Sequence, residues 1–215
     1  MTDLPPAVRA AAAPPSALLA ARALGCRRGR RMLFRGVDLA LAPGRITWLR
    51  GTNGSGKTSL LRILAGLSFA AEGEVIRAGA PLYIGHQNGL KDDLTLAEAL
   101  QFHAALADLD DCAGRSTRAL EQLALTPWCD AMVRTLSQGQ RRRGALARLA
   151  LDETPRAWVL DEPFDALDAQ SVERLSALIV GHAARGGAVL LTSHQPVALA
   201  GATEFDLEPR RVRER

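Results

Sequence analysis

The sequence predicts an α/β protein of the phosphate-binding-loop type, in which buried strands deliver polar residues to one edge of a sheet. Three stretches support this fold. They are Arg45–Gly66, with the pattern strand, glycine-rich loop and helix; Ala157–Leu160, an apolar run before Asp161-Glu162; and Ala188–Thr192, an apolar run before Ser193-His194. Such runs are typical of strands covered on both faces, and ligands of open α/β sheets bind where the strands end.

The composition fits one substantial core with a small attached subdomain. Of the 215 residues, 47% are hydrophobic and only 4% aromatic, so Leu, Ala and Val must fill most of the core. The longest apolar stretches are interrupted by Arg, Pro or Gly well before the roughly 18 residues that a membrane-spanning helix needs. We therefore expect a soluble protein. Such a protein can still dock on a component that lies in the membrane.

The N-terminal segment and the cysteines indicate a cytoplasmic protein. Residues 1–17 are rich in Pro and Ala and predict a disordered leader. They do not form a signal peptide, because the prolines interrupt any apolar segment. Cys26, Cys112 and Cys129 lie far apart, and an odd, unclustered set fits a reduced protein better than disulfides or a zinc site.

Positive charge is carried almost wholly by arginine. The net charge is +4, and the 27 Lys and Arg residues include only two lysines, Lys57 and Lys91. Arginines cluster at residues 27–31, 141–143 and 210–215. A nucleic-acid surface is one interpretation. The clusters are short, separate and free of interleaved aromatics, so solvated arginines with local phosphate and partner contacts are favoured.

The glycine-rich loop is the clearest ligand site in the sequence. Glycines at positions 51, 54 and 56 permit backbone angles closed to other residues, so N–H groups can approach phosphate oxygens at the positive end of the following helix. Lys57 is expected to bridge the β- and γ-phosphates, and Thr58 to bind Mg²⁺ through its hydroxyl. The predicted loop comprises Gly51, Thr52, Asn53, Gly54, Ser55, Gly56, Lys57 and Thr58.

Two short strands are predicted next, at residues 74–77 and 82–87. The second closes with Gln87, whose amide could reach a metal or the attacking water, although an exposed glutamine is the commoner finding. Thr95 and Glu98 then form a capping box that opens a helix to about residue 107.

A loop over residues 108–114 is predicted to precede a helix at about 116–125. We therefore expect an inserted helical subdomain at about residues 95–150. Its last helix starts near Leu136–Gln140, where Ser137 and Gly139 place a hydroxyl, backbone N–H groups and the helix dipole toward an anion. A Ser-x-Gly pair is usually only a helix cap, but its position between the phosphate loop and Asp161-Glu162 favours anion binding.

Carboxylates and a histidine follow the two later strands. Asp161 is expected to hold Mg²⁺ through water, and Glu162 to act as general base on the water that attacks the γ-phosphate. After a helix to about residue 184, the next strand brings His194 to the same edge, where it could hydrogen-bond the γ-phosphate. The remaining histidines, His86, His103 and His182, have no such context and are interpreted as incidental.

The ordered motifs GTNGSGKT, Gln87, LSQGQ, VLDEP, ALD and His194 resemble the nucleotide-binding subunits of ABC transporters, from about residue 18 to residue 207. The resemblance implies a P-loop ABC fold over residues 18–215: a mixed central sheet with helices on both faces, an N-terminal antiparallel β-subdomain and the inserted helical subdomain. It implies an ATPase with Mg²⁺ as cofactor and two copies arranged head to tail.

The resemblance also assigns the site residues. It implies that Glu162, His194 and Gln87 are catalytic, and that Thr58, Gln87 and Asp161 surround the metal. ATP would lie between the loop of one copy and Ser137, Gly139 and Gln140 of the other. Two positions depart from the usual pattern: Gln138 replaces a glycine, and Arg28 replaces the aromatic residue that stacks on adenine, a role that a planar guanidinium can also fill.

Within that superfamily, the segments CRRGRRMLFRGVDLAL, YIGHQNGLKDDLT, EALQFH and LSQGQRRRGALARL are similar to the ATP-binding export proteins of cytochrome c maturation. This similarity implies integral membrane subunits as partners at the cytoplasmic face of the bacterial inner membrane, where the chain is peripheral. ATP hydrolysis would serve haem export or release of haem-loaded chaperone. No CxxCH motif is present, so haem binding is assigned to the partners, and Lys91 is expected to contribute to docking.

Three rival functions stay open at this stage. An exporter subunit for another substrate is excluded only by resemblance. A DNA-associated ATPase with an ABC head would carry long heptad segments, which the sequence lacks. A regulator that uses ATP only to dimerise would not need Glu162 and His194.

Overall fold

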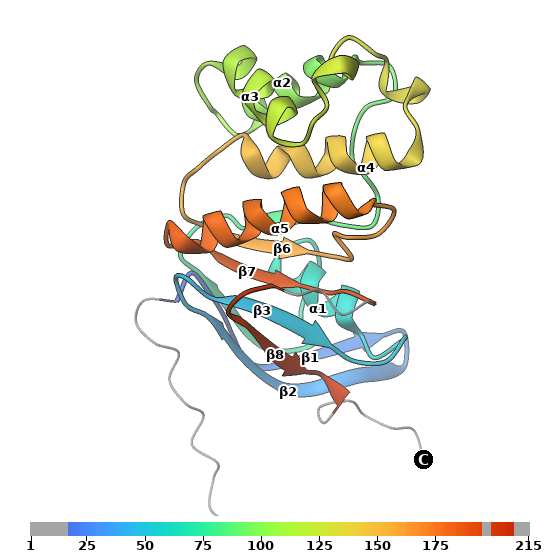
Figure 1. Cartoon of the computed structure of the whole chain (residues 1–215). Coiled ribbons are helices and arrows are strands. Elements are labelled where there is room, and N and C mark those ends of the chain that lie inside the picture. The colour runs from blue at the N-terminus through green and yellow to red at the C-terminus, as the bar shows by residue number, and fades with distance from the viewer. Residues whose placement is uncertain (1–16, 195–198, 209–215) are drawn as a thin grey trace, which may run out of the picture.

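The computed structural model describes residues 17–194 and 199–208 (Figure 1). The strands are β1 (Leu19–Arg28), β2 (Arg31–Leu41), β3 (Ile46–Arg50), β4 (Glu72–Arg77), β5 (Leu82–Ile84), β6 (Ala157–Leu160), β7 (Ala188–Leu191) and β8 (Ala202–Asp206). The helices are α1 (Lys57–Leu64), α2 (Leu96–Leu106), α3 (Cys112–Gln122), α4 (Gln138–Ala147) and α5 (Ala169–Ala184), with 3₁₀ turns at Thr126–Trp128, Val133–Thr135 and Arg148–Ala150. Residues 1–16 of the predicted leader and the 210–215 arginine cluster lie outside the described residues.

The central sheet has five strands in the order β5-β6-β7-β3-β8, and the described pairings in it are all parallel. β6 and β7 are buried along their whole length, which confirms the two apolar strands. Because parallel strands end on the same edge, the segments that follow Arg50, Leu160 and Leu191 meet there.

A second sheet, with the order β2-β1-β4, is antiparallel. The antiparallel strands expected near the N-terminus are therefore confirmed, and β1 continues to Arg28 rather than ending near Gly25. This sheet is the N-terminal antiparallel β-subdomain that the resemblance implies, whereas the central sheet, expected to be mixed, has only parallel pairings among the described strands.

Both faces of the central sheet are buried against helices. Alternate residues of β6 point to opposite sides: Trp158 and Leu160 join a cluster with α2, α4 and α5, whereas Val159 packs with α1 and the antiparallel sheet. Figure 1 shows α5 between the central sheet and helices α2, α3 and α4. Helix α1 lies on the opposite side of that sheet. The predicted helices on both faces are confirmed.

Helices α2, α3 and α4 pack together beyond α5 (Figure 1), and we call residues 95–150 the helical layer. The predicted capping box at its start is present. The Thr95 hydroxyl accepts from the Glu98 N–H at 3.2 Å, and the Glu98 carboxylate accepts from the Thr95 N–H at 2.8 Å. These two bonds fix where α2 begins.

Two predicted boundaries were wrong. α3 begins at Cys112 rather than near residue 116, because the Asp111 carboxylate caps its first turn by accepting from the Gly114 N–H at 3.1 Å. β5 ends at Ile84 rather than at residue 87, and the next carbonyl, of Gly85, accepts from a side chain of α4 instead of from a strand.

Candidate active site

The glycine-rich loop joins β3 to α1 at the edge where the parallel strands end. Gly51, Gly54 and Gly56 have φ angles of 150°, 77° and 104°, at which side chains are strained. A Cβ atom on Gly56 would lie 2.9 Å from Cδ1 of Phe34, so this position needs glycine for space as well. Gly56 is the N-cap of α1, and no described side chain caps that helix. The backbone N–H groups at the start of α1 are therefore placed to bind an anion.

Lys57 extends back across this loop. Its ammonium group donates to the carbonyl of Gly51 at 2.7 Å and to that of Thr52 at 3.3 Å. An ammonium group is a compact charge on a flexible stem, so it can exchange these two carbonyls for phosphate oxygens without a change in the backbone.

A cavity of about 690 Å³ opens beside the loop, within the range that holds drug-sized and nucleotide-sized ligands. It is lined by the β1–β2 hairpin, the loop, the start of α1 and the residues after β5, β6 and β7. The lining residues are Arg28, Arg31, Leu33, Asn53, Gly54, Gly56, Lys57, Thr58, Ser59, His86, Asp161, Glu162, Asp165 and His194. The structure therefore brings together phosphate-binding, acidic and histidine groups predicted from separate motifs.

Asp161 and Glu162 leave β6 in a tightly bonded turn. Glu162 has a φ of 50°, which is uncommon for a residue with a side chain. Its N–H donates to the fully buried Thr192 hydroxyl at 2.8 Å, and that hydroxyl donates to the Asp161 carboxylate at 3.0 Å. Thr192 thus fixes both acids, and sequence reasoning missed it because a threonine at a strand end carries no signal of its own.

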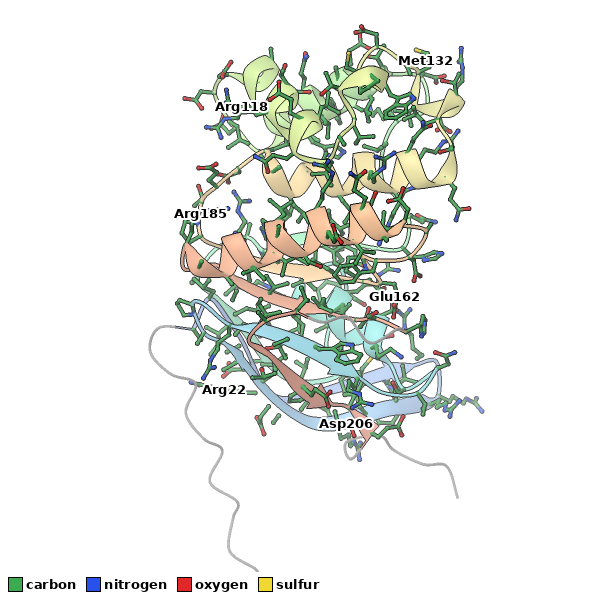
Figure 2. The ribbon with its side chains drawn as sticks, viewed as in Figure 1. Arg22, Arg118, Met132, Glu162, Arg185 and Asp206 are labelled. Carbon is green, nitrogen blue, oxygen red and sulfur yellow. The ribbon has the colours of Figure 1, made fainter. Side chains whose placement is uncertain are left out.

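Glu162 and His194 lie in contact. The Glu162 carboxylate accepts from the backbone N–H of His194 at 2.9 Å, and its other oxygen lies 3.6 Å from Nε2 of the His194 ring. Burial raises the pKa of Glu162, while His194 and Thr192 oppose that rise. A carboxylate with a raised pKa is a stronger proton acceptor. Figure 2 shows Glu162 at the sheet edge beside α1.

The residues present fit a bound Mg²⁺. The Thr58 hydroxyl and the Asp161 carboxylate line the same cavity, and Mg²⁺ prefers such oxygen ligands together with phosphates and water. Within residues 17–194 and 199–208, no group of three or more His, Cys, Asp or Glu side chains could hold a metal.

The structure does not bring Gln87 into this cavity. Gln87 is exposed, and the preceding His86, which the sequence suggested was incidental, lines the cavity instead. The prediction assumed that Gln87 closes a strand. Because β5 ends at Ile84, Gln87 lies in the segment that follows it.

Part of the predicted loop also faces elsewhere. The Glu208 carboxylate accepts from the N–H of Thr52 at 2.8 Å and from its hydroxyl. Gly51 and Thr52 line a separate cavity with Asp206 and Glu208, and Ser55 is fully buried beneath the loop. The residues of the loop that line the larger cavity are Asn53, Gly54, Gly56, Lys57 and Thr58.

Ser137, Gly139 and Gln140 are absent from the cavity lining. Ser137 and Gln140 form a capping box: the Ser137 hydroxyl accepts from the Gln140 N–H at 3.2 Å, and the Gln140 amide oxygen accepts from the Ser137 N–H at 2.8 Å. In Figure 1, α5 and the sheet separate α4 from α1. One chain therefore does not place these residues on its own phosphate loop.

Arg28 is the residue to which the resemblance assigns the contact with adenine. It lines the cavity, and its Nε donates to the Ser59 hydroxyl at 3.4 Å. Arg31 and Leu33 line the same wall and were missed. The signal that could have found Arg31 is the hairpin, because a turn at Gly29 pairs Arg28 with Arg31 across β1 and β2.

Comparison with known proteins decides the family. The sequence matches the ABC transporter family over residues 34–165. This chain belongs to the ABC transporter family. It is 46% identical to the cytochrome c biogenesis ATP-binding export protein CcmA 2 of Cupriavidus metallidurans, over 86% of this chain and 93% of that protein. It is 40% identical to CcmA of Nitrosomonas europaea, over 90% and 96%, and 47% identical to CcmA of Yersinia pestis, over 83% and 86%.

Solved structures show the same fold. A putative ABC transporter ATP-binding protein from Pyrococcus furiosus superposes with a TM-score of 0.78 at 22% identity, over 90% of this chain and 99% of that one. A dimeric ATP-binding cassette, MJ0796, bound to ADP and Pi, superposes with a TM-score of 0.72 at 22% identity, over 82% and 88%. The ABC fold and the ABC-type ATPase class predicted from the motifs are confirmed. Among the described helices, none has the length and apolar character to cross a membrane.

Proposed function

We propose that this chain is the ATP-hydrolysing subunit of a membrane ABC complex in cytochrome c maturation. The observation that carries the proposal is the convergence of Lys57, Asp161, Glu162 and His194 on one cavity. The relatives that share 40% to 47% of its residues are named cytochrome c biogenesis ATP-binding export proteins. The proposed role is haem export or release of haem-loaded chaperone.

The chemistry is in-line attack of water on the γ-phosphate. Glu162 accepts the proton of that water, and His194, fixed beside it, orients the reacting groups. Lys57 moves from its backbone carbonyls to the phosphate oxygens and stabilises their charge. When bound near Thr58 and Asp161, Mg²⁺ supplies further neutralisation of phosphate charge. Exposed Gln87 joins the site only if the segment after β5 changes its conformation.

A second copy completes the site in this proposal. Ser137, Gly139 and Gln140 lie away from the cavity of their own chain, so a head-to-tail homodimer is needed to place them on bound ATP. ATP then holds the two copies together, and hydrolysis releases them.

Integral membrane subunits are the proposed partners, with the chain peripheral on the cytoplasmic face of the bacterial inner membrane. Lys91 lies with its ammonium 4.4 Å from the ring centroid of Phe102. Phe102 and Leu106 are 37% and 68% exposed. Lys91, which lies close in sequence to Gln87, forms the proposed docking face together with Phe102 and Leu106. Haem is left to the partners, and a nucleic-acid role is not proposed.

The decisive variant is Glu162→Gln, which keeps the shape and the bond from His194 but removes the base. We expect turnover to fall by about 10²- to 10⁴-fold, while ATP binding is retained and an ATP-bound dimer accumulates. ATPase assays and size-exclusion chromatography measure both. The matched control is Glu121→Gln on the exposed surface of α3, expected to match wild type. Near-wild-type turnover of Glu162→Gln would contradict the mechanism.

Co-purification from membranes tests the cellular role. Recovery of cytochrome c maturation subunits with the tagged chain would support it. Recovery of integral subunits for another substrate would favour a different exporter, and stimulation of the ATPase by DNA would favour the DNA-associated alternative.

A further inference from the structure

Three consecutive arginines on α4 make different contacts. Arg141 and Arg143 donate to backbone carbonyls within the helical layer, and Arg143 also lies over the Trp128 ring. Arg142 is only 4% exposed and extends toward the central sheet instead. Its guanidinium therefore connects the helical layer to the catalytic edge.

The contacts of Arg142 converge on the residues around the proposed base. One terminal nitrogen donates to the carbonyl of Gly85 at 2.8 Å, and the other donates to the carbonyls of Glu162 at 2.6 Å and Asp161 at 3.2 Å. Gly85 immediately precedes the His86-Gln87 segment. A single side chain thus joins α4 to the ends of β5 and β6.

The backbone of Glu162 needs such support. Its φ of 50° is a conformation that persists in residues with side chains only where the surroundings hold it. Thr192 holds the N–H of Glu162, while its carbonyl accepts from Arg142 and from the Asp165 N–H at 3.3 Å. Arg142 is the long-range partner of that carbonyl, because Asp165 belongs to the same turn.

We propose that Arg142 is a positioning residue for Glu162. It fixes the carbonyl and hence the direction of the carboxylate, and it makes that direction depend on where α4 lies. α4 begins next to Ser137, so movement of this helix when a second copy engages would be transmitted directly to the base. This inference rests on the proposed function, since it assumes that Glu162 is the base.

The kinetic test compares Arg142→Met with Arg143→Met in the full chain. We expect Arg142→Met to lower kcat by about 10- to 100-fold with little change in the dissociation constant for ATP, because Arg142 does not line the cavity. Arg142→Lys, which retains a cation but not the planar fork, should recover part of the loss. Arg143→Met should leave kcat close to wild type.

A double variant separates positioning from general structural damage. In the Glu162→Gln background, Arg142→Met should cause no further fall in single-turnover hydrolysis, because the base that it positions is already missing. An equal fall in both backgrounds, or an equal loss in Arg143→Met, would overturn the proposal.

Hydrogen–deuterium exchange gives a readout that needs no hydrolysis. Arg142→Met and Arg142→Lys should exchange faster than wild type over residues 157–165, whereas Arg143→Met should change exchange around residues 123–128. Unchanged exchange over 157–165 in a folded Arg142→Met chain would overturn the positioning role. An inactive wild-type chain would overturn the proposed function, while the exchange result would still decide the role of Arg142.

Discussion

The starts of α1 and α4 both present helix N-termini to anions in the proposed site, yet they are built differently. α1 starts at Gly56, with no described side-chain cap, and its first residues line the cavity. α4 starts at Ser137, and the capping box with Gln140 already satisfies N–H groups at its end. The N–H groups at the start of α1 are open to a ligand within their own chain, whereas two N–H groups at the start of α4 already donate to side chains of that helix start.

The two helix starts therefore have different roles in the proposed site: α1 binds the nucleotide, and α4 of a second copy completes the site around it. The open start of α1, together with Lys57, can hold phosphate in a single chain. In the proposed dimer, the Ser137 hydroxyl can donate to a phosphate that the other chain carries while it still accepts from the Gln140 N–H. We therefore expect changes at α1 to alter nucleotide affinity and changes at α4 to alter turnover.

Of the two helix starts, α1 is expected to show the larger effect, in the variant Lys57→Ala. Loss of the charged hydrogen bonds to phosphate should weaken ATP binding by about 100-fold, measured by calorimetry with the full chain. The matched control is Lys91→Ala, which removes the other lysine of the sequence and should leave ATP affinity unchanged. If Lys57→Ala and wild type bind ATP with equal affinity, the start of α1 does not bind the phosphates as inferred.

A smaller effect, on a different quantity, is expected from Ser137→Ala. Removal of one donor to the developing charge should lower kcat by about 10-fold or more, while ATP affinity of the single chain changes little. Thr95→Ala removes the other capping-box hydroxyl, on α2, and should cost similar stability, about 1 kcal/mol, without the loss of turnover. If both variants lose turnover equally, the loss reflects helix stability.

The smallest effect expected is on the stability of the fold, which depends on pH through Glu162. Because burial raises the pKa of Glu162 above its ordinary 4.5, the folded chain holds this proton more tightly than the unfolded chain. The stability that Glu162 contributes is therefore present below pH 4.5 and is lost as the pH rises through the raised pKa.

Glu162→Gln should consequently melt a few degrees above wild type at about pH 8, with the difference shrinking toward about pH 5. Thermal unfolding without nucleotide measures this, with Glu121→Gln as the exposed control. A wild-type chain that is the more stable of the two at about pH 8 would contradict a raised pKa.

Local patterns predicted the parts of this molecule that depend on neighbours in the chain. The strand-loop-helix at residues 45–66 and the capping box of Thr95 and Glu98 are present as expected. Apolar runs also located β6 and β7, because strands buried on both faces carry no polar alternation. The motif order predicted that Lys57 and Glu162 share a site, which the cavity lining shows.

Misses arose where distant residues decide the local structure. Gln87 was placed on a strand, but the bond from Arg142 to Gly85, 57 residues away in sequence, lies where that strand was expected to continue. Arg31 and His86 reach the cavity because a hairpin and a loop fold over it. No pattern within a short window records such contacts.

The sequence alone determined the class of fold, the phosphate loop and the identity of the acids, because each depends on residue types at short spacing. Only the tertiary structure decided which loop residues face the cavity, that Arg142 and Thr192 hold Glu162, and that the start of α4 lies apart from its own phosphate loop. The physical reason is that these features depend on packing of the helical layer against the sheet, which joins residues far apart in the chain.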